Sequence, residues 1–197
     1  MILTDHPHPL DSPDYLRPWG AKNDDTHCPG FVEWVRDTFG PTAKHLDLGC
    51  AGGGLVADMR DAEFDSMGIE GSEEPKRLGR PAWLKYPEAF CHADIGKKFL
   101  LSGGCFEVIS AWEVLEHIPG ADLPTLFSNV RIHLAPGGAF VGTVSMNFDK
   151  DYHQTVKSQE WWENLFREQG FDIHYDLPES ARARTDGGSF CFRATLS

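Results

Sequence analysis

The chain has 197 residues, of which 18 are basic and 30 are acidic, so its formal net charge is −12. Hydrophobic residues make up 41% and charged residues 24%, a balance typical of one globular domain with its own core and not of a disordered chain. Nucleic acid is disfavoured as a partner, because affinity for it depends on clustered Lys and Arg. No apolar run approaches the roughly 18 residues that cross a bilayer, so we expect no membrane insertion.

In chain order, the sequence predicts strands that alternate with helices. Up to about Pro29 no periodicity is sustained. The predicted strands are 44–48, 66–70, about 89–95, 106–111, 139–144, about 171–175 and about 189–195. Apolar residues at helical spacing predict the helices, and they are Phe31, Trp34, Val35 and Phe39, then Leu55, Val56 and Met59, then Leu123, Leu126, Val130 and Leu134, and last Trp161, Trp162, Leu165 and Phe166.

This alternation indicates an α/β fold with a parallel sheet that is covered by helices on both faces. No helix is predicted between the last two strands, so they should form an antiparallel hairpin at one edge of the sheet. We expect a single domain over residues 1–197, with an N-terminal lid or helix segment at 1–40 and a catalytic core at 41–197.

A Gly-rich turn follows the first predicted strand, and a helix follows the turn. Strand 44–48 runs into Gly49-Cys50-Ala51-Gly52-Gly53-Gly54. Glycine permits positive φ and close approach of a ligand, and the free N–H groups of a helix start attract anions. The segment is a weak match to a dinucleotide fingerprint because Ala51 takes the place of the middle glycine.

Five motifs in order resemble those of class I S-adenosylmethionine-dependent methyltransferases. They are residues 45–53 (HLDLGCAGG), Glu70 at the end of the second strand, residues 92–95 (HADI), residues 106–118 ending in Leu-Glu-His-Ile, and residues 134–138 (LAPGG). Ala51 departs from the first motif, which has glycine there, and this could restrict the approach of the methionine moiety. The resemblance implies a three-layer Rossmann-like methyltransferase fold, with a mostly parallel seven-stranded sheet and an antiparallel C-terminal hairpin.

The resemblance also implies the cofactor, S-adenosyl-L-methionine, and its product, S-adenosyl-L-homocysteine. In that family the acidic residue matched by Glu70 binds both ribose hydroxyls, and the Asp matched by Asp94 faces the adenine amino group. Trp112 would offer cation–π stabilisation to the sulfonium, pack on the adenine or fill the core. The full expected cofactor set is Asp47, Gly49, Cys50, Ala51, Gly53, Glu70, Gly71, Asp94, Ile95, Ala111 and Trp112.

Two histidines are the candidate catalytic residues, because a neutral imidazole can accept a proton near pH 7. His117 follows the fourth strand and His153 follows the fifth, so both should approach the carboxyl end of the sheet. The alternative for His117 is a structural role, in which it bonds to backbone or to a helix end, and the alternative for His153 is a place in a surface loop. Tyr15 and Trp19, in the irregular N-terminal stretch, could form a lid or dock a helix.

A metal site is the alternative for the same region. Glu113, Glu116 and His117 share one helical face at i, i+3 and i+4. The set resembles the magnesium site of ubiquinone-pathway O-methyltransferases, and small-RNA 2′-O-methyltransferases use a similar set plus a later histidine, which His153 could mimic. Leu-Glu-His is nevertheless widespread in methyltransferases without metal, so we expect no bound metal.

The predicted function is methyl transfer to a small-molecule acceptor, with oxygen favoured over nitrogen or carbon. The alternatives are a small-RNA or nucleotide-end 2′-O-methyltransferase, opposed by the charge of −12, and a catalytically silent module that binds S-adenosylmethionine. A nicotinamide-dependent oxidoreductase is opposed by Leu115-Glu116-His117 and by Pro136-Gly137-Gly138. The sequence carries no signal for the acceptor's identity or for the oligomeric state.

The cysteines and the N-terminus indicate a reducing compartment. Cysteines 28, 50, 91, 105 and 191 form no C-x-x-C pair, so we expect reduced, mostly buried thiols. Residues 1–7 lack the basic and apolar regions of a signal peptide. We therefore expect a cytoplasmic location.

Overall fold

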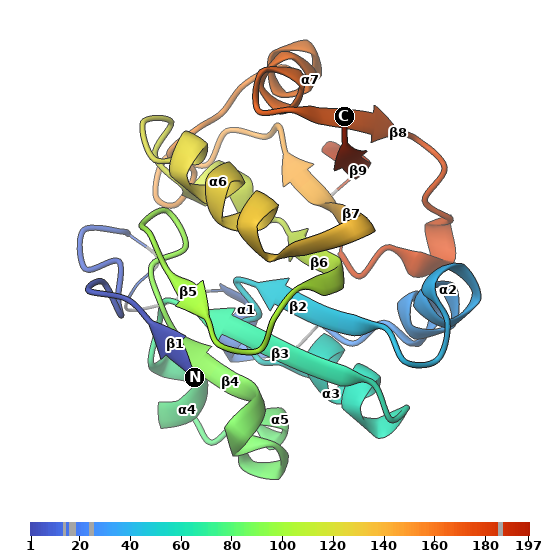
Figure 1. Ribbon diagram of the computed structural model, residues 1–197. Coiled ribbons are helices and arrows are strands. Elements are labelled where there is room, and N and C mark those ends of the chain that lie inside the picture. The colour runs from blue at the N-terminus through green and yellow to red at the C-terminus, as the bar shows by residue number, and fades with distance from the viewer. Residues whose placement is uncertain (14, 16–18, 24–25, 185–186) are drawn as a thin grey trace.

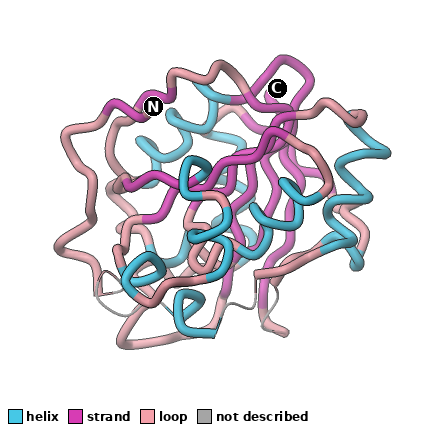
Figure 2. Tube along the Cα trace, turned by 90° about the horizontal axis from the view of Figure 1, so that it is seen from below, coloured by secondary structure: helices cyan, strands magenta, loops and turns pink. Residues whose placement is uncertain are grey.

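The fold is built on a central seven-stranded sheet, which helical segments flank in two perpendicular views (Figures 1 and 2). The computed structural model describes residues 1–13, 15, 19–23, 26–184 and 187–197. The strand order is β4-β3-β2-β6-β7-β9-β8. Their bounds are β2 Lys44–Leu48, β3 Asp65–Glu70, β4 Phe90–His92, β6 Phe106–Trp112, β7 Leu134–Ser145, β8 Phe171–His174 and β9 Ser189–Leu196. Strands β4, β3, β2, β6 and β7 are parallel, and β9 is antiparallel to both of its neighbours.

Helices cover both faces of this sheet. They are α1 Trp19–Asn23, α2 Pro29–Phe39, α3 Gly54–Asp61, α4 Glu74–Arg77, α5 Pro81–Lys85, α6 Leu123–His133 and α7 Gln159–Glu168, with 3-10 turns η1 Pro87–Ala89, η2 Leu115–His117 and η3 Glu179–Ala181. Buried side chains of α6 and α7 pack with one face of the sheet, and those of α2 and α3 pack with the other. The predicted three-layer, mostly parallel fold with an antiparallel C-terminal hairpin is confirmed.

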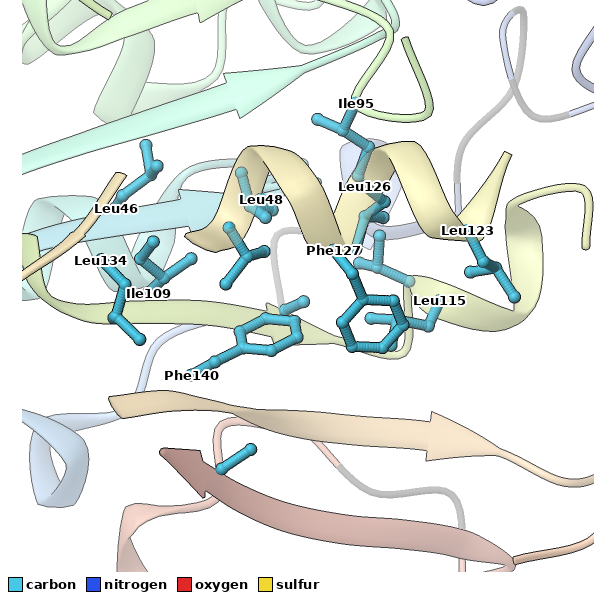
Figure 3. Close-up of a cluster of buried hydrophobic side chains, with 14 of the residues drawn as sticks. Leu46, Leu48, Ile95, Ile109, Leu115, Leu123, Leu126, Phe127, Leu134 and Phe140 are labelled. Carbon is cyan, nitrogen blue, oxygen red and sulfur yellow. The ribbon is translucent and has the colours of Figure 1, made fainter. Parts of the chain in front are cut away.

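The period of two along the strands decides which layer each side chain enters. Leu46 and Leu48 belong to the same buried cluster as Leu126 and Phe127 of α6, with Leu46 at the end of the cluster near Leu134 (Figure 3). His45 and Asp47 alternate with these leucines and therefore face the layer of α2 and α3. The apolar side chains stabilise the fold by about 1.5–3 kcal/mol each when fully buried.

Two predicted strands differ from the observed ones. β4 has three residues instead of about seven, because Asp94 N donates to His6 O at 2.9 Å and Gly96 N donates to Asp94 Oδ1 at 2.9 Å, so the chain turns out of the sheet. β7 starts at Leu134, earlier than predicted. The Pro-Gly-Gly segment lies inside the strand as an irregularity, with Phe106 opposite Leu134 and Val108 opposite Ala139.

A two-stranded sheet escaped the sequence prediction. β1 (Ile2–Leu3) pairs antiparallel with β5 (Leu100–Leu101), which ties the N-terminal stretch to the chain between β4 and β6. Strands of two residues leave no periodicity to read. The cysteines are free thiols, and among them Cys105 is exposed. Within the described ranges, no helix combines the length and the apolar character needed to cross a bilayer.

Candidate active site

A pocket of about 1020 Å³ lies where the carboxyl ends of β2, β3, β4, β6 and β7 meet, the usual ligand position in an α/β sheet. It brings together nine of the predicted site residues, namely Gly49, Ala51, Glu70, Gly71, Asp94, Ile95, Trp112, His117 and His153. Four others of the predicted cofactor set do not line it, namely Asp47, Cys50, Gly53 and Ala111. Seven of the eleven expected cofactor residues and both expected catalytic histidines therefore share one pocket.

The Gly-rich turn depends on backbone conformations that favour glycine. Gly49 has φ 69° and Gly53 has φ 82°, both in the left-handed region. A Cβ on Gly49 would lie 2.7 Å from Val114 Cγ2, so a side chain there would displace its neighbour. Ala51 also adopts a positive φ of 47°, which costs a residue with a Cβ some conformational strain.

Glu70 connects the turn after β2 to the loop after β3. Its Oε2 accepts a hydrogen bond from Ala51 N at 2.8 Å, and its Oε1 accepts one from Ser72 N at 2.9 Å. The side chain is 7% exposed and lines the pocket. Glu70 was expected only as a cofactor ligand, on the basis of its place at the end of a strand. The two backbone bonds give it a structural role that sequence reasoning missed.

The four predicted residues outside the pocket lining are packed against other parts of the fold. Cys50 packs with Val56 and Trp83 in a separate apolar cluster, and Ala111 lies in the main core. A Cβ on Gly53 would lie 2.6 Å from the Phe90 ring, so this glycine permits close packing of α3 on β4. Their predicted contact with the cofactor stays a prediction.

Asp47 also lies beneath the pocket and is 3% exposed. Ser110 Oγ donates to Asp47 Oδ1 at 2.6 Å. Burial raises the pKa of Asp47 to about 7; the Ser110 bond opposes this shift and the nearby charge of Glu70 adds to it. The carboxyl is therefore poised between its two charge states near neutral pH.

The N-terminal stretch forms one wall of the pocket. His8 Nδ1 donates to Gly71 O at 2.9 Å, and Ser72 Oγ donates to Tyr15 O at 2.5 Å. His6, His8 and Tyr15 all line the pocket. Sequence reasoning singled out Tyr15 but missed both histidines, because the pairing that places them here has no sequence signal. The side chain of Trp19 lies outside the described part of the chain.

The other end of the pocket begins where β6 ends. Glu113 has a φ of 54°, an uncommon conformation for a residue other than glycine, and its N–H donates to Thr143 O at 3.0 Å. The turn η2 then presents Glu116 and His117. Such backbone outliers occur most often at functional sites.

The loop after β7 is tied to η2 by hydrogen bonds. Gln154 N and Thr155 N donate to Glu116 O at 2.8 and 2.9 Å, and Gln154 Nε2 donates to His117 O at 2.7 Å. These bonds bring His153 against His117, with ring centroids 4.9 Å apart and planes at 83°. The two predicted catalytic histidines are thus neighbours.

Glu116 completes a cluster with these histidines. One ligand atom from each of Glu116, His117 and His153 lies within 4.8 Å of the others. Glu116 is fully buried; its Oε1 accepts from Ser145 N at 3.1 Å, and its Oε2 has no hydrogen-bond partner among the described residues. Burial raises the pKa of Glu116 to about 8, with His117 acting to lower it and Glu113 to raise it.

The proton positions on His153 follow from its partner. His153 Nδ1 lies 2.8 Å from Asn147 O, and a carbonyl can only accept, so Nδ1 carries the hydrogen. The neutral ring then has a lone pair on Nε2. Trp112, which also lines the pocket, stacks edge-on against Phe31 at 5.7 Å, and its Nε1–H has no acceptor within the described residues.

Comparison with known families decides the class of this protein. The family model described as a methyltransferase domain matches residues 21–180. The chain belongs to the methyltransferase domain family. This membership confirms the predicted methyltransferase family.

Curated relatives of this methyltransferase include ubiquinone biosynthesis O-methyltransferases. The protein from Acinetobacter baumannii (strain ACICU) is 27% identical over 158 residues, which cover 77% of this chain and 65% of the relative. The protein from Pseudomonas aeruginosa (strain UCBPP-PA14) is 29% identical over 120 residues, which cover 59% of this chain and 51% of the relative. The methyltransferase therefore spans between half and two thirds of the length of these relatives.

Solved structures show the same fold. The glycopeptide N-methyltransferase MtfA in complex with S-adenosylmethionine superposes with a TM-score of 0.64 at 14% identity, over 87% of this chain and 95% of that one. A TehB-like methyltransferase from Corynebacterium glutamicum superposes with a TM-score of 0.66 at 17% identity, over 96% and 100% of the two chains. The ligand of the MtfA complex is the cofactor predicted from the sequence.

Proposed function

We propose that this methyltransferase moves the methyl group of S-adenosylmethionine to an oxygen atom of a small-molecule acceptor. The observation that supports this proposal is the cluster of Glu116, His117 and His153, which lies in the same pocket as the Gly-rich turn. The O-methyltransferases among the curated relatives favour oxygen as the acceptor atom, whereas MtfA is an N-methyltransferase.

The cofactor lies, in this proposal, between the Gly-rich turn and the N-terminal stretch. Gly49 and Ala51 border its methionine end, Glu70 accepts from the ribose hydroxyls, and Asp94 faces the adenine amino group. Both oxygens of Glu70 accept backbone bonds in this arrangement, and a carboxylate has about four acceptor sites in all. Residues 1–13 and Tyr15 cover this end of the pocket as a lid.

The acceptor lies against His117 and His153. His153 Nε2 takes the proton of the acceptor hydroxyl as the oxygen attacks the methyl carbon. The carbon–sulfur bond breaks, and S-adenosylhomocysteine leaves with the electron pair on sulfur. An oxygen acceptor needs this help because its proton must depart, and general-base assistance is typically worth about 10²–10⁴ in rate.

A divalent cation at the same cluster is the second candidate. Its motivation is the buried Glu116 Oε2 without a partner, next to two imidazoles. Ligand atoms on opposite sides of a ~2.1 Å site are about 4.2 Å apart, close to the 4.8 Å span of the cluster. Glu116, His117 and His153 would hold the ion, and the ion would lower the pKa of an acceptor hydroxyl.

The test is a methyl-transfer assay with labelled S-adenosylmethionine over pooled metabolites and, separately, small RNAs. We expect labelled product from the metabolite pool only. Label in RNA would favour the 2′-O-methyltransferase alternative, and cofactor binding without any labelled product would favour the silent module. Repeating the assay with EDTA and then with added magnesium distinguishes the general base from the cation. Activity that EDTA removes and magnesium restores indicates the cation, and activity that EDTA leaves unchanged indicates the base.

A further inference from the structure

Four buried polar side chains form a continuous hydrogen-bonded chain under the cofactor end of the pocket. Ser66 Oγ lies 2.9 Å from His45 Nδ1, His45 Nε2 lies 2.8 Å from Ser110 Oγ, and Ser110 Oγ lies 2.6 Å from Asp47 Oδ1. They come from β3, β2 and β6, because His45 is paired with Ser66 and Asp47 with Ser110 in the sheet. The first three are 0% exposed.

Nothing in the packing of the fold requires polar groups here. The layer around them holds apolar side chains of α2 and α3, and the Phe31 ring contacts the His45 ring at a centroid distance of 5.3 Å. Burying such groups is costly unless every one of them is hydrogen-bonded, and here each link is closed. The series of hydrogen bonds ends at Asp47, two residues before the pocket residue Gly49.

When Asp47 is ionised, the donors and acceptors of this hydrogen-bonded series are fixed. A carboxylate only accepts, so Ser110 must donate to it, and Ser110 then accepts from His45 Nε2–H. Burial lowers the pKa of His45 to about 3, so the ring is neutral and its Nδ1 accepts from Ser66. A proton on Asp47 lets every link reverse, so that Asp47 donates to Ser110, Ser110 donates to Nε2, and Nδ1–H donates to Ser66.

We propose that Ser110, His45 and Ser66 are positioning residues for the cofactor, which hold Asp47 ionised in one rotamer beneath the Gly-rich turn. The proposal rests on the proposed function, since the cationic amino group of the cofactor's methionine end is the charge that an ionised Asp47 stabilises. The titratable groups facing Asp47 are Glu70 from β3, Cys50 from the turn and His45 from its own strand. Glu70 and burial both favour protonation of Asp47, and Ser110 opposes them.

The test measures the affinity for S-adenosylhomocysteine by calorimetry between pH 6 and pH 8.5. For the wild type we expect affinity to rise with pH, with a midpoint near the Asp47 pKa of about 7. Ser110→Ala should move the midpoint up by about one unit and therefore weaken binding about fivefold at pH 7. Ser110→Thr retains the hydroxyl, so its affinity at pH 7 and its midpoint should both match those of the wild type. Thr143→Val, which removes another buried sheet hydroxyl, one that donates to Arg184 O, should leave the midpoint unchanged.

A second measurement needs no variant. The ring nitrogens of His45, followed by NMR in the wild type, should change from Nδ1–H to Nε2–H as pH rises through the same midpoint and as cofactor product is added. An identical midpoint in wild type and Ser110→Ala, or a single His45 tautomer throughout, overturns the inference. A wild type that does not bind S-adenosylhomocysteine at any pH overturns the proposed function instead.

Discussion

The two ends of the pocket are built in different ways. At the cofactor end, each wall segment directly follows the strand that positions it. The carboxylate of Glu70 joins the turn after β2 to the loop after β3. The acceptor end is made by a loop that reaches back over the end of another strand, with Gln154 and Thr155 bonded to η2. The cofactor end therefore depends on the same interactions as the fold, whereas the His117 and His153 side chains of the acceptor end can change without loss of the sheet.

The acceptor end should give the largest effect on turnover. His117→Ala and His153→Ala should each lower turnover by about 10²–10⁴, with the cofactor affinity and melting temperature nearly unchanged. Steady-state kinetics and calorimetry measure the two quantities on the same preparations. His174→Ala is a matched control, because His174 is bonded to Thr195 on β9, away from this pocket. Full activity in both variants, with no response to EDTA, would leave positioning as the whole mechanism.

At the cofactor end, the buried His45 should make the free energy of unfolding depend on pH in the acid range. Native His45 binds its proton only near pH 3, and the unfolded residue binds it below about 6.5, so the free energy of unfolding should fall as pH drops from 6.5 to 3. The full loss is a few kcal/mol, at about 1.4 kcal/mol per unit of pKa difference. Asp47 has the opposite slope, since its raised pKa means that stability falls as pH rises from about 4 to 7.

Urea unfolding at pH 4.5, 5.5 and 6.5 isolates the histidine's contribution when wild type is compared with His45→Gln. The variant should be less stable at pH 6.5, and its deficit should shrink toward pH 4.5. A deficit that stays constant with pH would show that His45 is not the neutral, buried group that the chain requires.

Glu70 should affect both stability and affinity. Glu70→Ala should weaken cofactor binding by about 1.5–3 kcal/mol and, unlike the acceptor-end variants, lower the free energy of unfolding by about 1–3 kcal/mol, because two backbone donors lose their acceptor. Calorimetry and urea unfolding measure the two losses. Glu70→Gln keeps one acceptor oxygen, so its affinity and its stability should lie between those of the wild type and those of Glu70→Ala. Stability equal to wild type would contradict the structural role of the carboxylate.

The smallest expected effect is at Ala51. Ala51→Gly removes the strain of a positive φ at some cost in unfolded-chain entropy, so we expect a net gain of about 0.5 kcal/mol. That corresponds to a rise in Tm of about 1–2 °C for a chain of this length. Ala57→Gly, inside α3, is the control and should lower stability by about 1 kcal/mol. A lower Tm for Ala51→Gly would show that the methyl group is needed for packing.

The same contrast explains what could be predicted from the sequence. Gly49 and Glu70 stand at the ends of strands whose apolar patterns are readable, so both the fold and their position at the carboxyl edge follow from local residues. His6 and His8 reach the pocket through a pairing of two-residue strands, and the cluster of His117 with His153 depends on bonds between residues 37 positions apart. No local pattern encodes such contacts. The sequence predicted only that both histidines follow strands and approach the same edge of the sheet, and it gave no sign that their rings are in contact.

The tethered loop after β7 has a consequence for changing what this enzyme accepts. The bonds that fix it come from Gln154 and Thr155 at its end, and most of them are received by main-chain oxygens of η2. Its tip, with Phe148 79% exposed at the pocket, makes no part of that anchor. His153 is held by the main-chain oxygens of Asn147 and Asp149, which exchange of Phe148 and Tyr152 retains, so these two positions can reshape the pocket entrance while His153 stays in place. A combinatorial library restricted to these two positions is the shortest route to variants with new acceptors.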